Sequence, residues 1–384
     1  MPTAVADLPP YQRPPATEED LEYVDLALID VSKFNQPGGK EQLVEDLRNA
    51  IEKLGFFLVV GHGIEDEEVL RQLSIGNAFF KLPLEEKRQH PCDFEVGNYF
   101  GYREPKEVYD NSKIKYNIEM LNNPKDTAVL AHERLRHDFV QPFRSEIGDF
   151  SAKVHARVLD PLLRLFSLLL ELPEDYLSAP HAYDKAGDDH LRYMIYRPYS
   201  ADESEEIGNQ YVKGHTDFGL LTILFPQIVN ALQVQVEEGV YKYVPYVKDA
   251  IVVNTAEVLT FISGGHIKST VHRVIRPPED QADHERLGLL YFSRPANDFL
   301  VKVAPSPLLQ RLGLYDPAKE EPNPPTGLEW GRARVKHTHL RANIEHKTAQ
   351  KPFQFGKHIV NLEYKSPAVL TQRSRAATPV TALA

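Results

Sequence analysis

The chain has 384 residues, of which 42% are hydrophobic and 26% charged, a composition typical of a soluble globular protein with one large domain or two ordinary ones. Its formal net charge of −11 argues against nucleic acid or an anionic membrane as a main partner, because both reward clustered Lys and Arg. The single cysteine, Cys92, excludes an internal disulfide and any Cys-rich zinc or iron–sulfur site.

The N-terminal half of the sequence is predicted to be mostly helical. Residues 1–20 are Pro-rich and acidic, which indicates a flexible arm, and they lack the pattern of a signal peptide. Two short β-prone runs lie at 23–34 and 56–63. Apolar residues recur at helical spacing in three segments: 39–55, 66–83 and 132–172, the last divided by Pro142 and Pro161. The polar stretch 88–128 is predicted to form loops.

From about residue 190 the hydrophobic period changes to two, which is typical of strands. The runs of this kind are separated by Gly, Pro or acidic residues: HLRYMIYRPY, GLLTILF, LQVQVEEGVYKYV, AIVVNT, VLTFISGG, STVHRVI and LGLLYFSRP. The residues around Glu237 to Gly239 predict a hairpin. Many short strands at regular spacing indicate an all-β sandwich or barrel.

These patterns predict a division of the chain into five parts. They are a flexible arm (1–20), a mostly helical region (21–185), a β-core (186–305), a partly helical C-terminal segment (306–365) and a disordered tail (366–384). The longest apolar run, LLRLFSLLLEL, is short and contains Arg164 and Glu171, so we expect no bilayer-spanning segment and a cytoplasmic protein.

His215 and Asp217 stand at the start of an apolar run, in VKGHTDFGLLTIL. A buried charge is costly unless it is paired or binds a metal. Alternation along a strand would direct both side chains to one face, and His272, on a separate predicted strand, could add a third ligand. Two histidines and one carboxylate on one face of a metal are the arrangement of non-haem Fe(II) oxygenases. A core histidine bonded to its neighbour would give the same pattern, so spacing alone leaves both interpretations open.

Arg286 opens the predicted strand that follows His272. It shares one face of that strand with the residues at every second position after it: Gly288, Leu290 and Phe292. An arginine that faces a β-core needs an anion, and its planar fork suits a carboxylate. The order of residues therefore fits a pocket for a metal and a dicarboxylate, with a surface arginine as the alternative.

Seven segments resemble, in order, the isopenicillin N synthase-like branch of the Fe(II)/2-oxoglutarate-dependent dioxygenases, over roughly residues 23–305. They are VDLALIDVSKF, GFFLVVGHGI, AFFKLPLEEK, GHTDFGLLTIL, ALQVQ, VVNTAEVLTFISGGHIKSTVHRV and RLGLLYFSRP. The resemblance implies a mainly β fold with flanking α-helices around a double-stranded β-helix (jelly roll) core. It also implies Fe(II) as cofactor, 2-oxoglutarate and O2 as co-substrates, and a hydroxylation, desaturation or ring closure that releases succinate and CO2.

Carried over residue by residue, the family motif makes His215, Asp217 and His272 the iron ligands and catalytic centre. Arg286 becomes the anchor for the distal carboxylate of 2-oxoglutarate. The resemblance thus gives the four residues definite roles that their spacing alone does not.

Two departures from the family pattern concern the 2-oxoglutarate site. The family usually has Arg-x-Ser, and Gly288 stands where the serine would be. A hydrogen bond from that hydroxyl to a charged group would contribute about 1.5–3 kcal/mol. The family's Asn-x-Tyr-Pro is not matched either, since Met194 takes the place of the Asn. Tyr196 and Arg192 are expected to contact 2-oxoglutarate instead.

Substrate selection is expected to fall to the loop region and the C-terminal segment. Seven residues are candidates for substrate contact: Tyr99, Phe100, Tyr102, Lys115, Tyr116, Phe225 and Tyr291. Aromatic residues in loops more often serve packing, which is the competing interpretation for each of them. The aromatic content predicts a small, largely apolar or ring-containing substrate, a specialised metabolite.

Three other functions stay open at the level of the sequence. An isopenicillin N synthase-type oxidase would use the same iron site without 2-oxoglutarate, and Arg286 would then hold the substrate's own carboxylate. A non-catalytic small-molecule binder could share the fold, although the intact metal motif argues against it. A zinc hydrolase would need a general base to activate bound water, and the sequence offers none that is well placed.

Overall fold

The structure is a computed structural model that describes residues 8–105, 112–126, 137–343, 353–356 and 358–360. Its strands are β1 (Ala27–Asp30), β2 (Phe56–Val60), β3 (Gly101–Arg103), β4 (Ile118–Pro124), β5 (His190–Tyr196), β6 (Gln210–His215), β7 (Leu221–Leu224), β8 (Leu232–Glu237), β9 (Val240–Tyr243), β10 (Ile251–Thr255), β11 (His272–Ile275), β12 (Arg286–Phe292), β13 (Phe353–Phe355) and β14 (His358–Val360). Its α-helices are α1 (Gly39–Lys53), α2 (Asp66–Phe80), α3 (Leu84–Lys87), α4 (Arg144–Val154), α5 (Asp160–Leu169), α6 (Ala201–Glu206), α7 (Glu257–Ile262), α8 (Pro307–Arg311) and α9 (Gly327–Asn343).

Two antiparallel sheets form the centre of the described chain. The larger has the strand order β1-β2-β10-β7-β12-β5-β4-β3, and the smaller has the order β6-β11-β8-β9. The pairing of β1 with β2 at the edge of the larger sheet is parallel. Residues of both sheets line one pocket, so the pocket lies between the two sheets. The predicted fold class, a jelly roll with flanking helices, is confirmed.

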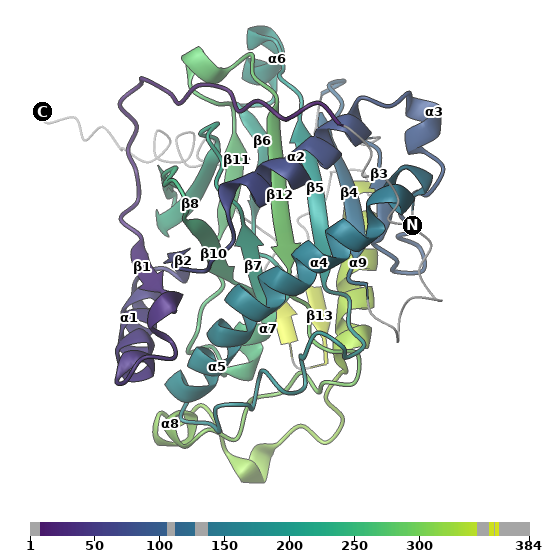
Figure 1. The fold of residues 1–384 in the computed structure, drawn as a ribbon. Helices are drawn as coiled ribbons and strands as arrows, with labels where there is room; N and C mark the ends of the chain where they lie inside the picture. Colours follow the sequence, from purple (N-terminus) through teal and green to yellow (C-terminus); the bar gives the residue numbers. More distant parts are fainter. Residues whose placement is uncertain (1–7, 106–111, 127–136, 344–352, 357, 361–384) are drawn as a thin grey trace, which may run out of the picture.

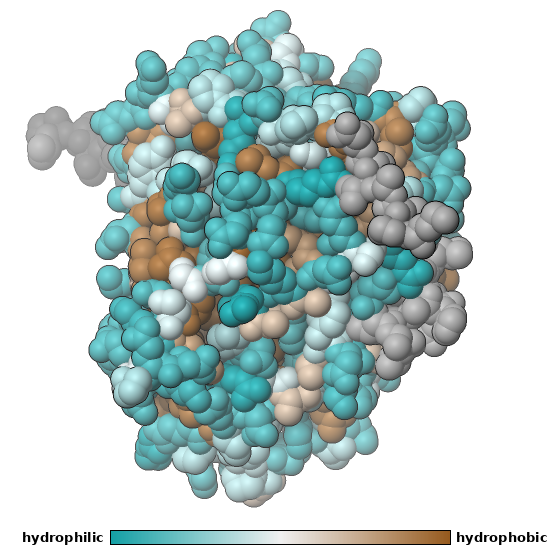
Figure 2. Space-filling model, in the orientation of Figure 1, coloured by the Kyte–Doolittle hydropathy of each residue, from teal (hydrophilic) through white to brown (hydrophobic). Residues whose placement is uncertain are grey.

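Helices α2, α4 and α5 lie across the outer face of the larger sheet (Figure 1). Pro161 closely follows a π-helical segment, His155–Leu159, that joins α4 to α5, so its missing N–H falls where the helical hydrogen-bond pattern is already shifted. The outward face of these helices is mostly hydrophilic (Figure 2), because their apolar side chains pack against the sheet. No helix in the described part of the chain has the length and apolar character needed to cross a membrane.

Most predicted elements occur where the hydrophobic period places them, including the hairpin of β8 and β9. The run VLTFISGG was predicted as a strand, which is wrong, because its first part forms the helix α7. Val258, Leu259 and Ile262 are buried, and a short apolar run does not distinguish a helix from a strand by period alone. Strand β6 was not recognised, because its QYVKGH sequence is mostly polar.

The stretch 88–128 was predicted to be loops, which is wrong for β3 and β4. All seven residues of β4 are buried, although its sequence IEMLNNP contains Glu119, Asn122 and Asn123. Glu119 and Asn122 are buried there with hydrogen-bond partners from other parts of the chain, and composition does not reveal those partners.

Residues 8–20, predicted as part of a flexible arm, lie against the body of the protein. The backbone N–H of Tyr11 donates to Ser74 Oγ over 2.9 Å, and Arg13 forms an ion pair with Asp66. Figure 1 shows this purple segment crossing the top of the molecule. The tail predicted for 366–384 lies outside the described residues, and the limits of the five parts stay predictions.

A buried ion pair supports the strands around the pocket and generates a stability prediction. Lys125 Nζ lies 2.9 Å from Asp189 Oδ2, and both side chains are at least 96% buried. Changing Lys125→Met leaves the Asp189 charge without its partner, so the free energy of unfolding should fall by about 3–5 kcal/mol. Urea unfolding measures this. Lys319→Met, which breaks an exposed pair with Asp316, is the control and should change it by less than ~0.5 kcal/mol. Equal effects would contradict the prediction.

Candidate active site

Two histidines and one aspartate converge at one end of strands β6 and β11 of the smaller sheet. His215 ends β6, His272 begins β11, and the two residues are direct neighbours in the antiparallel ladder. Their rings are 4.3 Å apart, centroid to centroid. One ligand atom from each of His215, Asp217 and His272 lies within 4.8 Å of the other two. Over the described residues, no other group of three His, Cys, Asp or Glu side chains is placed to hold a metal ion.

Asp217 reaches this point from a turn and not from a strand. Strand β6 ends at His215, so the expectation that alternation along one strand aligns the two side chains was wrong in its geometry. The Asp217 carboxylate is held by the larger sheet, because its Oδ2 accepts hydrogen bonds from Thr222 Oγ1 at 2.6 Å and Asn254 Nδ2 at 3.0 Å. Thr222 and Asn254 are themselves paired across β7 and β10.

The hydrogen bonds of both imidazoles orient their ligand atoms. Nδ1 of His215 lies 2.9 Å from the carbonyl of Lys213, and Nδ1 of His272 lies 3.2 Å from that of Thr270. An Nδ1–H that donates to a carbonyl leaves the lone pair on Nε2, as metal-ligating histidines require. The Nε2 atoms lie 4.0 and 3.8 Å from the oxygens of Asp217. Imidazole and carboxylate donors without sulfur suit Fe(II), so the residues present fit this ion.

The electrostatics of Asp217 also favour a bound cation. Burial alone would raise the pKa of its carboxyl group. The two imidazoles and the hydrogen bonds from Thr222 and Asn254 outweigh burial and hold the pKa of Asp217 well below its usual range. A carboxylate that remains charged in a buried place requires positive charge beside it. The imidazoles supply this charge when they are protonated, and a metal ion supplies it when they bind the ion as neutral ligands.

Helix α9 supports the site from outside through a buried ion pair. Arg334 donates to both carboxylate oxygens of Glu257, over 2.9 and 2.8 Å. Glu257 also accepts a hydrogen bond over 2.7 Å from Oγ1 of Thr216, the residue between His215 and Asp217 in the sequence. The backbone N–H of Glu257 donates to the carbonyl of Asp217. Burial raises the pKa of Glu257, which the Arg334 charge counters. The turn that carries Asp217 is thus fixed from two sides.

The pocket beside the three residues has a volume of about 340 Å³. Arg286, Gly288, Leu290 and Phe292 all line it, which confirms that these alternate residues of β12 share one face. Arg286 is buried, and its guanidinium lies 5.1 Å from the centre of the Tyr196 ring, its neighbour across β5 and β12. No ion pair joins Arg286 to a carboxylate of the described residues. A buried guanidinium of this kind fits a carboxylate ligand.

The candidate substrate residues fall into different places. Tyr99 and Tyr116 line the pocket. Lys115 lines a separate surface pocket beside α6. Phe100 packs its ring edge on His190, 5.8 Å between centroids, and is not among the lining residues. Tyr99 and Tyr116 thus remain candidates for substrate contact, and Lys115 and Phe100 do not.

Phe225 and Tyr291 belong to the hydrophobic core, so their prediction as substrate contacts was wrong. Phe225 packs on Phe150 of α4, with ring centroids 5.3 Å apart. Tyr291 is fully buried on the face of β12 opposite to Leu290 and Phe292. The alternation that placed Arg286 in the pocket places Tyr291 outside it.

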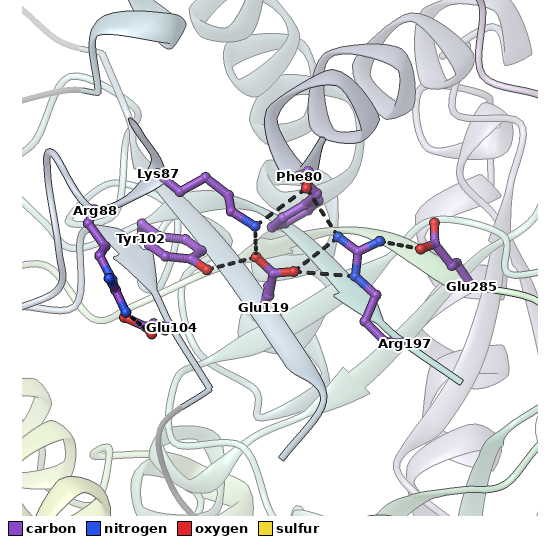
Figure 3. Close-up of polar contacts among 8 residues, drawn as sticks. All are labelled: Phe80, Lys87, Arg88, Tyr102, Glu104, Glu119, Arg197 and Glu285. Atoms are coloured by element: carbon purple, nitrogen blue, oxygen red, sulfur yellow. Dashed lines mark hydrogen bonds and ion pairs between the residues drawn. The ribbon is translucent and has the colours of Figure 1, made fainter. Parts of the chain in front are cut away.

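Tyr102 was predicted to contact substrate, but it belongs to a buried polar network centred on Glu119 (Figure 3). Its hydroxyl donates to Glu119 Oε2 over 2.7 Å. Glu119 also accepts from Lys87 at 2.5 Å and from Arg197 at 3.0 Å, and Arg197 bonds in turn to Glu285. Burial, together with the hydrogen bond to Glu119, raises the pKa of Tyr102. Its role is therefore structural.

Sequence reasoning missed several lining residues. Arg294 continues the alternation that begins at Arg286, so the same signal would have found it. Phe218 directly follows Asp217 and also lines the pocket. Thr222 and Asn254 carry no signal in one sequence, because only the register of β7 and β10 brings them to Asp217.

Comparison with known proteins agrees with this geometry. Residues 188–295 match the model of the 2OG-Fe(II) oxygenase superfamily, and residues 26–138 match that of the non-haem dioxygenase in morphine synthesis N-terminal domain. The chain belongs to the 2OG-Fe(II) oxygenase superfamily. Fe(II) is accordingly the cofactor of this oxygenase and 2-oxoglutarate its co-substrate. The family match decides against the non-catalytic binder and the zinc hydrolase.

Two curated relatives and one solved structure are similar to this oxygenase over most of its length. The 2-oxoglutarate-dependent dioxygenase frbA of Dothideomycetidae sp. (strain 11243) is 28% identical over 294 residues, 70% of this chain and 85% of that protein. The 1-aminocyclopropane-1-carboxylate oxidase of Dictyostelium mucoroides is 24% identical over 326 residues, 75% of this chain and 86% of that protein. The crystal structure of a 2OG-Fe(II) oxygenase family protein from Caulobacter crescentus has a TM-score of 0.68 at 18% identity, covering 82% of this chain and 99% of that one, and it supports the fold.

The contrast between Tyr102 and Tyr116 gives a testable prediction. Tyr102→Phe removes a hydrogen bond to a buried carboxylate, so the free energy of unfolding should fall by about 1–3 kcal/mol. Tyr116→Phe, in the half-buried pocket wall, should lower it by less, because water can reach a half-buried position and satisfy the groups left there. Urea unfolding of the two variants against the parent measures both. A larger loss at Tyr116 than at Tyr102 would show that the roles are reversed.

Proposed function

We propose that this oxygenase binds one Fe(II) ion through His215, Asp217 and His272 and oxidises a small, largely apolar or ring-containing metabolite. The convergence of these three side chains at one end of a pocket of about 340 Å³ carries the proposal. That volume suits a small metabolite next to 2-oxoglutarate. Rings of Tyr99, Phe218 and other aromatic residues in the wall favour an apolar or cyclic substrate.

The residues of the site have separate tasks in this proposal. When bound, Fe(II) would activate O2 for oxidation of the substrate, and 2-oxoglutarate would be converted to succinate and CO2. Thr222 and Asn254 keep Asp217 in place before a ligand arrives, so little reorganisation accompanies binding. Arg286 and Tyr196 bind the distal carboxylate of 2-oxoglutarate. The aromatic and aliphatic side chains of the wall exclude water from the reacting carbon of the substrate.

The experiment that tests the function is an oxygen-dependent screen. The protein is loaded with Fe(II) and 2-oxoglutarate under anaerobic conditions and mixed with oxygenated buffer that contains one ring-containing metabolite at a time. A substrate should raise succinate formation above its rate without substrate and yield a product that has gained an oxygen atom or lost two hydrogens. A chain that forms no succinate under any of these conditions would contradict the proposal.

Replacing the proposed anchor of 2-oxoglutarate gives a quantitative prediction. Arg286→Gln removes the charge-assisted partner of the distal carboxylate, so the affinity for 2-oxoglutarate should fall about tenfold to several hundredfold. The visible charge-transfer band of the Fe(II)–2-oxoglutarate complex, titrated anaerobically, measures this. Iron binding should survive, because Arg286 is not one of the proposed ligands. A variant that titrates like the parent would place the anchor elsewhere.

Gly288→Ser is the companion variant, since it restores the hydroxyl usual in the family. A Cβ at Gly288 would lie 3.4 Å from the side-chain amide of Gln227, an ordinary contact, so the serine has room. The affinity for 2-oxoglutarate should therefore stay unchanged or increase. A weaker affinity would mean that Gln227 cannot share this space.

A further inference from the structure

The wall of the pocket is far more cationic than the chain as a whole. The protein has a formal net charge of −11. Among the described residues that line the pocket, the only carboxylate is Asp217, whereas six side chains are cationic: Arg103, Arg192, Lys213, Arg286, Arg294 and Arg334. Arg334 is neutralised by Glu257, and Arg286 is assigned to 2-oxoglutarate. Two of the remaining cations, Arg192 and Arg294, are almost fully buried.

Arg192 on β5 lines the pocket and has one guanidinium nitrogen without a hydrogen-bond partner in the described part of the chain. Its Nε donates to Asn122 Oδ1 over 2.6 Å. The guanidinium lies over the rings of Phe292 and Tyr99, 4.2 and 4.8 Å from their centres. Its Nη2 is buried without a hydrogen-bond partner among the described residues. Only 6% of Arg192 is exposed, so bulk water does not satisfy this donor.

Arg294, two residues after β12, is likewise buried, stacked on aromatic rings and left with one nitrogen without a partner among the residues that the structure describes. Its guanidinium stacks on Phe218, 3.7 Å from the ring centre, and also faces Phe292 at 5.2 Å. Its Nη1 is buried without a partner in the described chain, and 5% of the residue is exposed. Burial lowers the pKa of Arg294 to about 10, and the nearby charge of Arg192 adds to this, so the side chain stays protonated at neutral pH. Two like charges are thus buried close together.

The two arginines lie at the metal end of the pocket, away from Arg286. Arg192 pairs with Leu290 across β5 and β12, four positions from Arg286, or roughly 13 Å along the strand. Phe292, on which both guanidiniums lie, is paired with Thr222, the residue that holds Asp217. Arg192 and Arg294 therefore lie at the same height along the strands as the proposed iron site, where the substrate must bind. This location differs from the contact with 2-oxoglutarate predicted for Arg192 from the sequence.

We propose that the substrate of this oxygenase carries a carboxylate, and that Arg192 and Arg294 bind it while Phe218, Phe292 and Tyr99 contact its apolar part. The inference rests on the proposed function, because it concerns the substrate of the same site. Guanidiniums that stack on aromatic rings keep their N–H edges free, and a planar carboxylate fits those edges. Its negative charge also offsets the repulsion between the two buried cations. A neutral ligand would leave that repulsion in place.

The test compares carboxylic acids with their amides, which have the same shape without the charge. Phenylacetate and phenylacetamide, and cyclohexanecarboxylate and its amide, are titrated calorimetrically into the anaerobic protein loaded with Fe(II) and saturating 2-oxoglutarate. Saturation occupies Arg286, so the probes report on the other arginines. In at least one pair the acid should bind at least tenfold more tightly than the amide. Equal affinities, tighter binding of the amides, or no binding of any probe would overturn the proposal.

Variants separate recognition from structural support. Arg192→Met and Arg294→Met should each reduce the preference for the acid to less than about threefold and leave the affinity for the amide nearly unchanged, whereas Arg192→Lys should keep part of the preference. Arg48→Met, at an exposed pair with Glu45, is the control and should keep all of it. The thermal midpoint should be unchanged or higher in Arg294→Met, which removes a buried repulsion. In Arg192→Met the loss of the bond to Asn122 opposes that gain. Met variants that unfold earlier yet keep the preference would show a structural role and overturn the proposal.

The same titrations distinguish this inference from the proposed function. The charge-transfer band of the parent reports whether Fe(II) and 2-oxoglutarate bind. A parent without the band that still prefers the acids would contradict the function and support the carboxylate site. A parent that shows the band but does not prefer the acids would support the function and contradict the carboxylate site.

Discussion

A charged carboxylate buried between two imidazoles is the constraint on which the site depends. Asp217 is fixed by Thr222 and Asn254 of the larger sheet, whereas His215 and His272 are neighbours in the smaller one. The three side chains meet only if both sheets keep their register and their spacing. A slip of one residue in β11 would turn His272 to the other face. The jelly roll and the metal site are therefore a single structural requirement.

The distribution of charge follows from the same constraint. Most of the acidic residues that give the chain its net charge of −11 lie outside the pocket, whereas arginines are concentrated within it. Buried cations cost free energy unless an anion meets them. Glu257 meets Arg334 and ties α9 to the turn of the site. For Arg286, Arg192 and Arg294 the matching anions are provided by ligands in our account. The protein is therefore less stable without these ligands than with them bound.

The sequence predicted the parts of the fold that repeat a simple period. Alternation along β12 placed Arg286, Gly288, Leu290 and Phe292 correctly on one face. The hydrophobic period did not predict α7, because its short apolar run fits a helix or a strand equally well. It also did not predict β4, because Glu119 and Asn122 of this strand are buried with their hydrogen bonds satisfied. Partners distant in the chain, such as Thr222 for Asp217, depend on tertiary register and leave no local pattern. Aromatic content likewise could not separate Tyr99 in the pocket from Tyr102 in a structural network.

The amount of Fe(II) bound per chain tests the central claim most directly. Under anaerobic conditions the parent should bind about one ion per chain, and His266→Ala, which changes a histidine outside the site, should do the same. Asp217→Ala removes the only carboxylate ligand, so its affinity for Fe(II) should fall on the order of a hundredfold or more, by analogy with the 10–100-fold cost of losing even an outer-shell partner. Full occupancy in Asp217→Ala at the concentration that just saturates the parent would contradict the account.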